Sequence, residues 1–91
     1  MLEIDFTRLY LKDLKRIVRR NLPRHELDEV VGMLAEEQTL SPKFKDHALK
    51  GNWTGYRECH IRPDWLLVYR VERRVLTLVL VRTGTHSDIF G

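Results

Sequence analysis

The sequence predicts an α+β domain in which an N-terminal strand and an antiparallel helical hairpin pack on a small antiparallel sheet, in the order β-α-α-β-β-β. Apolar residues in the first forty positions repeat every three or four residues, which is typical of amphipathic helices. From position 53 onward, short runs of aromatic and β-branched residues are separated by turn residues, which is typical of strands. Helices followed by a run of strands favour an α+β fold.

Length and composition limit the chain to a small folded protein. With 91 residues, 43% of them apolar, we expect a single domain that spans residues 1–91. No apolar run is long enough to span a membrane and the first residues are acidic, so we expect neither a membrane segment nor export. The single cysteine excludes an internal disulfide and fits a reducing compartment, so we expect a cytoplasmic protein.

The N-terminal half is predicted to contain a short edge strand at residues 2–6 and then two helices. Residues 8–24 carry seven bases and one acid, whereas residues 25–38 carry five acids and no lysine or arginine. Thr7 is expected to cap the first helix, and the break at residues 21–23 is short enough to predict an antiparallel helical hairpin. The opposite charges favour pairing of the two helices. The apolar positions are Tyr10, Leu11, Leu14, Ile17 and Val18 in the first helix, and Leu27, Val30, Val31 and Leu34 in the second.

The C-terminal half is predicted to form three antiparallel strands after a loop at residues 40–51. Alternation in the first strand places Glu58 and His60 on one face and Cys59 on the other, which we expect to face the core. The last strand is apolar on both faces, as expected for a central strand. The strands are expected at residues 53–61, 65–72 and 75–82.

Three of the four histidines lie near strand ends: His47, His60 and His86. His25 begins the acidic helix and is expected to be a surface residue. No close His–His or Cys–Cys ligand pair is present, so we expect neither a metal nor another cofactor. Cys59 and His60 are adjacent in a strand and point to opposite faces, which disfavours a Cys–His nucleophile. General acid–base catalysis is the remaining chemistry, because histidine titrates near neutral pH.

Cationic and aromatic residues surround these histidines. Cations bind phosphates and flat rings stack on unstacked bases, so the pattern favours binding of single-stranded RNA. The alternative is a solvated basic surface with the aromatic residues in the core, and it applies most of all to Phe44, Trp53 and Tyr69. The residues concerned are Lys43, Lys45, Lys50, Arg57, Arg62, Arg70 and Arg82, with Trp53, Tyr56, Trp65 and Phe90.

Three blocks stand out by their order and spacing: DHALKGNWTGYRECHI at 46–61, PDWLLVY at 63–69 and RTGTHSDIFG at 82–91. Together they resemble the RelE/ParE toxin superfamily, and within it the YafQ-like branch. The resemblance implies a RelE-like fold and a toxin of a bacterial type II toxin–antitoxin system. Such a toxin is an mRNA endoribonuclease that acts in the ribosomal A site and is neutralised by a cognate antitoxin. The toxin–antitoxin complex is expected to bind its own operator DNA through the antitoxin.

The resemblance also implies roles for particular residues. The family's functional residues fall on His47, His60, Asp64, His86 and Phe90. The expected reaction is attack by the RNA 2′-OH, with His86 as general acid, His47 or His60 as general base, and Asp64 orienting a histidine; it requires no metal. The expected RNA contacts are Lys45, Lys50, Arg57, Arg62, Trp65 and Arg82.

The main alternative is a ParE-like toxin that binds and poisons DNA gyrase without cleaving RNA. It shares the fold but does not need clustered histidines, so His47, His60 and His86 favour the nuclease. We expect the cognate antitoxin to be acidic in its toxin-binding segment and to cover the basic face around His60, Arg62 and Arg82, so that it inhibits by occlusion.

Overall fold

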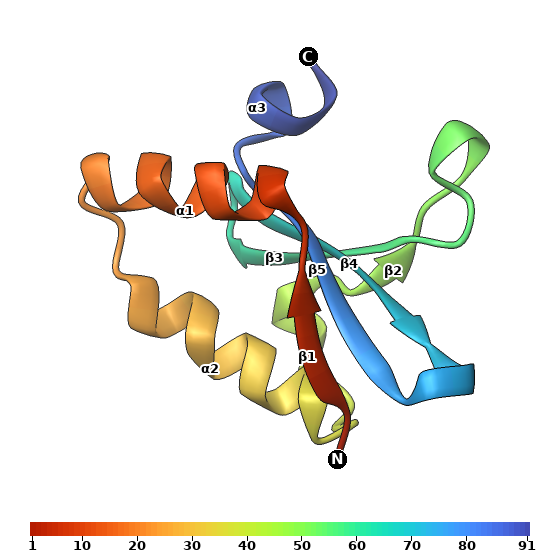
Figure 1. The fold of residues 1–91 in the computed structure, drawn as a ribbon. Coiled ribbons are helices and arrows are strands. Elements are labelled where there is room, and N and C mark those ends of the chain that lie inside the picture. Colours follow the sequence, from red (N-terminus) through yellow and green to blue (C-terminus); the bar gives the residue numbers. More distant parts are fainter.

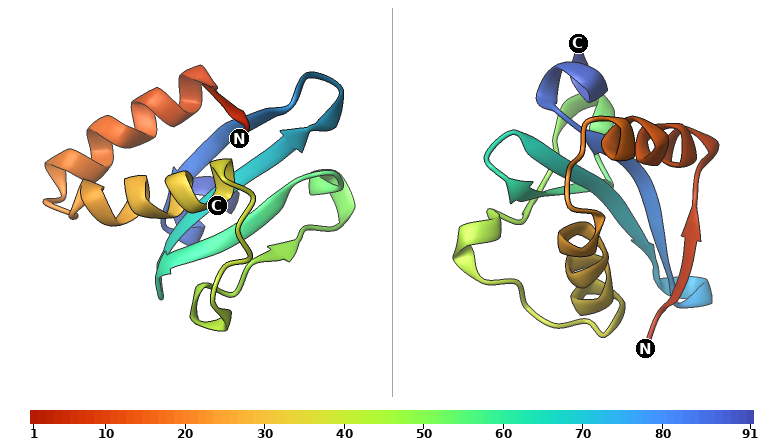
Figure 2. Two further views of the ribbon diagram at one scale, coloured as in Figure 1. Left: turned by 90° about the horizontal axis from the view of Figure 1, so that it is seen from below. Right: turned by 90° about the vertical axis from the view of Figure 1, so that its left-hand side faces the viewer.

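The computed structural model describes residues 1–91 as a five-stranded sheet in the order β1-β5-β4-β3-β2, with α1 and α2 on one face (Figures 1 and 2). The predicted α+β class is confirmed. No helix is long and apolar enough to cross a membrane. The elements are β1 (Glu3–Phe6), α1 (Arg8–Arg19), α2 (Arg24–Ala35), β2 (His47–Ala48), β3 (Arg57–Arg62), β4 (Trp65–Glu72), β5 (Thr77–Gly84) and α3 (His86–Phe90), with 3₁₀ turns at Pro42–Phe44, Gly51–Trp53 and Arg73–Val75.

The sheet differs in one respect from the antiparallel arrangement that the sequence predicts. Strands β3, β4 and β5 are antiparallel neighbours, but β1 pairs with β5 in parallel, from Glu3 beside Thr77 to Phe6 beside Leu80. The parallel sense brings the end of β1 to the place where α1 begins and crosses β5 (Figure 1). The two-residue strand β2, at the other edge, lies in a segment that was predicted to be a loop.

The two helices run in opposite senses and spread apart from their turn (Figure 2). Thr7 caps α1 as predicted, because its side-chain oxygen accepts a hydrogen bond from the backbone N–H of Tyr10 at 3.0 Å. The predicted charge pairing between the helices is wrong, since no ion pair joins α1 to α2. Instead, Arg16 of α1 and the C-cap residue Arg20 pair with Asp88 of α3. Glu26 of α2 pairs with Arg62 of β3.

A buried polar junction joins α1 to the sheet. The carboxylate of Asp13, 1% exposed, accepts hydrogen bonds from Arg82 at 2.7 and 3.2 Å and from the backbone N–H of Thr83 at 3.1 Å. The Thr83 hydroxyl donates to the carbonyl of Leu66 and accepts from the Trp65 indole at 3.0 Å. Each buried polar group of the junction therefore has a partner, which is the condition for burying such groups without a large penalty.

Apolar side chains form two layers, one on each face of the sheet. The main core lies under α1 and α2 and contains Cys59, which is fully buried as predicted. Burial raises the pKa of the Cys59 thiol to about 12, so it is not a thiolate nucleophile at neutral pH. The smaller cluster on the opposite face consists of Leu66, Val68 and Ile89, packed by the half-buried side chains of Leu49, Trp53, Tyr56, Val81 and Phe90.

Local backbone conformations explain where element boundaries differ from the prediction. Strand β3 begins at residue 57, because residues 51–53 form a 3₁₀ turn and Gly55 has a φ of +96°. Strand β5 begins at residue 77, because Leu76 adopts a left-handed conformation after the preceding turn. Helix α3 was not predicted.

Replacement of Asp13 by Ala should destabilise the protein by about 3–5 kcal/mol, because the Arg82 guanidinium would be left without its partner in a largely buried position. Urea unfolding of the variant measures this difference. Glu29→Ala is the control, since Glu29 is exposed and makes no ion pair; its midpoint should be close to that of the wild type. Equal midpoints for both variants would mean that the Asp13 junction does not stabilise the fold.

Candidate active site on the second face of the sheet

The register of the sheet places His47 and His60 on the neighbouring strands β2 and β3. His47 of β2 lies directly across from Glu58 of β3, and Glu58 and His60 are two residues apart on the same face. The β4 residue opposite His60 is in turn opposite Gly84 of β5, two residues before His86. Because neighbouring strands are about 4.8 Å apart, the positions from His60 to Gly84 span roughly 10 Å.

Helix α3 positions His86 and Phe90 at the end of β5. Its start is closed by a capping box, in which Thr85 and Asp88 exchange hydrogen bonds between side chain and backbone. The Asp88 carboxylate also accepts two hydrogen bonds from Arg20, the C-cap residue of α1, at 2.6 and 3.1 Å. The short helix is therefore tied to α1 by a charged, bidentate contact.

The Arg20 guanidinium holds the pKa of the Asp88 carboxyl well below its usual range, and hydrogen bonds from Thr85 contribute to the same effect. Gly84 makes this contact possible. A Cβ at residue 84 would lie 2.8 Å from a carboxylate oxygen of Asp88, and its φ of +150° is one that other residues rarely adopt. A side chain at position 84 would displace the carboxylate that holds α3.

The His86 imidazole is exposed and rests against Phe90, with ring centroids 5.0 Å apart. Phe90 in turn packs edge-on against Trp53, at 5.2 Å. Asp64 accepts a hydrogen bond from the backbone N–H of His86 at 3.2 Å, so it fixes the start of α3 rather than the imidazole. Neither ring nitrogen of His86 has a hydrogen-bond partner in the chain, which leaves both available to a substrate.

His47 is held at both ring nitrogens. Its Nδ1 lies 2.7 Å from the carbonyl oxygen of Lys45, and its Nε2 lies 3.0 Å from a carboxylate oxygen of Glu58, which is 7% exposed. A carbonyl and an ionised carboxylate can only accept hydrogen bonds. Each ring nitrogen of His47 therefore already faces an oxygen atom of the chain, so neither can contact a substrate without giving up one of these contacts.

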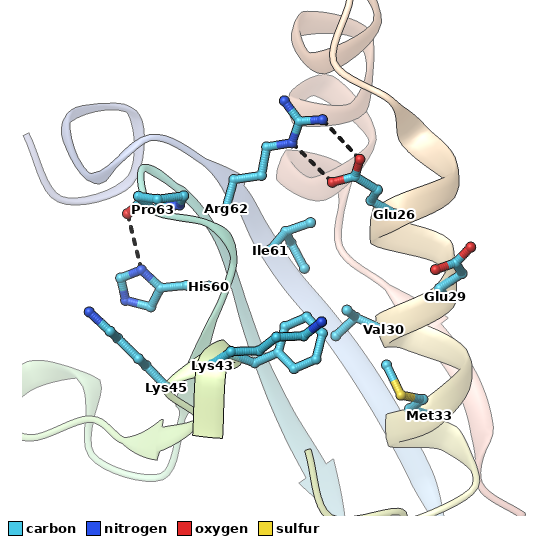
Figure 3. A pocket seen from close by; sticks show the side chains of 11 residues that line it. Glu26, Glu29, Val30, Met33, Lys43, Lys45, His60, Ile61, Arg62 and Pro63 are labelled. Atoms are coloured by element: carbon cyan, nitrogen blue, oxygen red, sulfur yellow. Dashed lines mark hydrogen bonds and ion pairs between the residues drawn. The ribbon is translucent and has the colours of Figure 1, made fainter. Parts of the chain in front are cut away.

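His60 is held at one nitrogen only. Its Nδ1 donates to the carbonyl oxygen of Pro63 at 3.1 Å, so Nε2 of the neutral ring keeps its lone pair. The ring lines a pocket of about 380 Å³ between α2, residues 42–45 and the end of β3 (Figure 3). In Figure 3, Lys45 and His60 lie on the side of this pocket away from α2, whose Glu26 accepts two hydrogen bonds from Arg62.

The expected cations differ in how free they are to bind RNA. Lys45 and Lys50 are exposed and have no ion-pair partner. Arg57 lies with its Nε 3.4 Å from both the Tyr69 hydroxyl and Asp46; these contacts raise its pKa, yet 43% of its side chain is exposed. These three side chains can reach a phosphate without breaking a strong internal contact, whereas Arg62 shares its charge with Glu26.

Two expected RNA contacts are wrong for this structure. Trp65 is 2% exposed, and its indole N–H is bonded to Thr83, so it has no face available for a base. Arg82 is bound to Asp13 and to the carbonyl of Asp88, with 15% of its side chain exposed. Both residues support the sheet and α3 instead.

Other residues of the site were missed by sequence reasoning. Glu58 and His60 lie two residues apart on one face of β3, as the sequence indicated. The pairing of Glu58 with His47 could not be predicted, because it depends on the register of β2. Thr85 and Asp88 have the spacing of a capping box, which was a readable helix signal. No group of three or more His, Cys, Asp and Glu side chains is arranged to hold a metal ion.

The site thus combines a mixed sheet, two helices on one of its faces, and histidines near the other. The sequence matches the family described as "Bacterial toxin of type II toxin-antitoxin system, YafQ" over residues 2–91, so the chain belongs to the YafQ toxin family. The mRNA interferase toxin YafQ of Escherichia coli K12 is 36% identical over 90 residues, which are 98% of this chain and 96% of that protein.

Solved structures agree with this assignment. A metal-bound toxin from Helicobacter pylori is 49% identical, with a TM-score of 0.94 over 99% of this chain and 100% of that one. The toxin of the E. coli DinJ–YafQ toxin–antitoxin complex is 35% identical, with a TM-score of 0.89 over 99% of this chain and 98% of that one. The fold is thus shared along nearly the whole length of each chain.

The depressed pKa of Asp88 predicts how the stability of α3 depends on pH. An ionised Asp88 stabilises the fold fully above the ordinary carboxyl pKa of about 3.9, and this contribution is lost as the pH falls through the lower folded-state pKa. The difference in unfolding free energy between the wild type and Asp88→Asn should therefore be constant above about pH 5 and shrink below about pH 4. Chemical unfolding at pH values above and below these limits measures it; a difference that grows on acidification would contradict the assigned ion pair.

Proposed function

We propose that this toxin, as one domain over residues 1–91, cleaves mRNA on the ribosome by histidine acid–base catalysis and is inhibited by a cognate antitoxin. The observation that carries the proposal is the exposed His86 imidazole, free at both nitrogens and fixed by α3 beside the face that bears His60 and His47. The name of the E. coli relative, mRNA interferase toxin, supports the same activity and not gyrase poisoning.

The nucleophile of the proposed reaction is the RNA 2′-OH. Its oxygen attacks the adjacent phosphorus while the bond from phosphorus to the 5′-oxygen breaks, which leaves a 2′,3′-cyclic phosphate and a 5′-hydroxyl. A base removes the proton of the 2′-OH, and an acid donates a proton to the leaving 5′-oxygen. The protein must also align the three reacting atoms and bind the charge that develops on phosphorus.

The surroundings of the ring nitrogens favour a distinct role for each of the three imidazoles. His60 is the proposed general base, because Nδ1 donates to Pro63 and Nε2 keeps a lone pair. His86 is the proposed general acid, since its ring is free to hold a proton toward the leaving oxygen. His47 is the proposed cation beside the phosphate oxygens, because both of its nitrogens already face acceptors. Asp64 is a positioning residue for His86.

Exposed cations and rings near the histidines supply the proposed RNA contacts. Lys45, Lys50 and Arg57 would bind phosphates, and Arg62 would do so at the rim of the His60 pocket. Phe90 packs edge-on against Trp53 and would stack on a base next to the scissile phosphate.

The proposed reaction also has consequences for the cofactors, the partners and the location of the toxin in the cell. Because RNA provides its own nucleophile, the reaction needs no metal-bound water; the metal in the H. pylori structure is a property of that protein. The DinJ–YafQ complex supports an antitoxin as partner. We further propose that the complex binds operator DNA through the antitoxin, and that the toxin acts in the cytoplasm, where ribosomes are.

Replacement of His86 by Gln should abolish mRNA cleavage by the ribosome-bound toxin and leave the thermal midpoint within a few degrees of the wild type, because the exposed imidazole makes no hydrogen bond within the fold. Mapping of mRNA ends and thermal unfolding measure the two effects. His25→Ala, at an exposed histidine on α2, should cleave normally. If His86→Gln unfolds, or still cleaves at the wild-type rate, the catalytic role of His86 is wrong.

A single 2′-deoxy substitution immediately 5′ of the scissile phosphate should stop cleavage and leave binding nearly unchanged, since one hydroxyl contributes at most about 1.5 kcal/mol of net hydrogen bonding. The substituted message should then act as a competitive inhibitor in a ribosomal cleavage assay. With the unmodified message, the single-turnover rate should be bell-shaped in pH, because one imidazole must be neutral and another protonated.

An enzyme that activates water would instead cleave the deoxy message and produce a 5′-phosphate end. That result would exclude the roles proposed for His60 and His86, whatever the family of the toxin.

A further inference from the structure

A group of polar side chains meets beside the start of β2, and the proposed mechanism uses only one of them, Arg57. The Tyr69 hydroxyl donates a hydrogen bond to the Asp46 carboxylate at 2.6 Å, and Arg57 Nε lies 3.4 Å from both of these groups. Tyr69 of β4 lies opposite Arg57 of β3, while Asp46 immediately precedes β2. We refer to the short hydrogen bond between Tyr69 and Asp46 as the clamp.

Tyr69 is the fixed end of the clamp. It belongs to the main core and is 2% exposed, whereas 24% of the Asp46 side chain is exposed. Burial, and after it the hydrogen bond to Asp46, raise the pKa of the Tyr69 hydroxyl well above its usual value. The hydroxyl therefore keeps its proton at neutral pH and remains a donor. Because its ring is held in the core, it determines where Asp46 lies.

The segment around Asp46 is short and exposed. Strand β2 consists of two residues at the edge of the sheet, and both of them are exposed (Figure 1). Lys45, just before Asp46, has a φ of +49°, a conformation that residues other than glycine rarely adopt and that surrounding contacts must hold. The clamp ties residue 46, which lies between this left-handed residue and β2, to the core.

The two neighbours of Asp46 in the sequence meet at the His47 imidazole. Nδ1 of His47 lies 2.7 Å from the carbonyl oxygen of Lys45, and Nε2 lies 3.0 Å from the carboxylate of Glu58. A shift of Asp46 would therefore move both the carbonyl and the ring. Asp46 contacts Arg57 and His47 contacts Glu58, and consecutive residues of a strand point to opposite faces. Asp46 thus acts from the face opposite the imidazole and does not itself reach the substrate.

We propose that Asp46 and Tyr69 are positioning residues for His47, and that the clamp holds the imidazole in place beside Glu58. Arg57 is not needed for this, because its contacts with Asp46 and Tyr69 are long. Its guanidinium can turn to a phosphate while the clamp remains closed. The inference rests on the proposed role of His47 beside the scissile phosphate.

The variant Tyr69→Phe tests the clamp, since it removes the hydroxyl and keeps the ring in the core. The single-turnover rate of mRNA cleavage on the ribosome, at saturating toxin, should fall about tenfold or more, because a small displacement of a group beside the reacting atoms slows the reaction. The toxin concentration that gives half the maximal rate should change by less than about twofold, since the cations that bind RNA are retained.

Tyr10→Phe is the matched control. Tyr10 is also buried in the main core, but its hydroxyl makes no hydrogen bond within the chain, so this variant should cleave mRNA like the wild type. Wild-type cleavage by both Tyr69→Phe and Asp46→Ala would overturn the proposal.

Further variants separate positioning from a general structural role. Asp46→Asn keeps an oxygen that can accept from Tyr69 and should retain most of the activity, whereas Asp46→Ala should lose as much as Tyr69→Phe. In a His47→Gln background, Tyr69→Phe should have no further effect on the rate, because the clamp acts through His47. An undiminished additional loss in that background would show that the clamp acts elsewhere, and the proposal would be wrong.

The placement of the imidazole can also be measured without a substrate. In nitrogen NMR spectra of the ring atoms, the shifts of His47 should change in both Tyr69→Phe and Asp46→Ala, while those of His25 and His86 should not. Unchanged His47 shifts in both variants would exclude the clamp as its positioning contact, even if cleavage fell. If Tyr69→Phe does not fold, Asp46→Ala, at a partly exposed residue, decides the same question. If the wild-type toxin does not cleave mRNA, the proposed function fails, while these spectra still decide this inference.

Discussion

The buried ion pair between Asp13 and Arg82 is the contact on which the arrangement of this protein depends. Removing two charges from water is costly, and the structure offsets this cost with a bidentate pair and a third hydrogen bond from the backbone of Thr83. The pair fixes α1 across the end of β5. Because Arg82 also donates to the carbonyl of Asp88, the same junction reaches the helix that carries His86.

The junction gives the two faces of the sheet different properties. On one face, α1 and α2 cover the main core, and Trp65 and Thr83 are used to connect strands to that core. On the other face a smaller apolar cluster supports α3 and leaves polar side chains exposed around it. Trp65 and Arg82, both expected to bind RNA, are therefore structural. The Trp65 indole donates to Thr83 in the interior, and the charge of Arg82 that suggested a phosphate contact is paired with Asp13.

The sequence predicted the features that depend on local pattern. Period-2 alternation correctly assigned Cys59 to the core, and the spacing of apolar residues located both long helices. Features that depend on distant contacts were not predictable in this way. The charge segregation of the two helices suggested that they pair with each other. In the structure, Arg20 forms an ion pair with Asp88, 68 residues away, and Glu26 forms one with Arg62. Nothing in the four residues of β1 indicates that their partner strand is parallel.

The proposed division of labour among the histidines follows from their acceptors rather than from their residue type. All three imidazoles have the same intrinsic chemistry, and sequence left His47 and His60 equivalent as candidate bases. Both ring nitrogens of His47 already face oxygen atoms of the chain, whereas only Nδ1 of His60 does, so Nε2 of His60 is open to a substrate. His86 has no hydrogen-bond partner at its ring within the chain, so both of its nitrogens are open to a substrate. Glu58, which the sequence analysis placed beside His60 without a role, is thus the residue that favours His60 over His47 as the base.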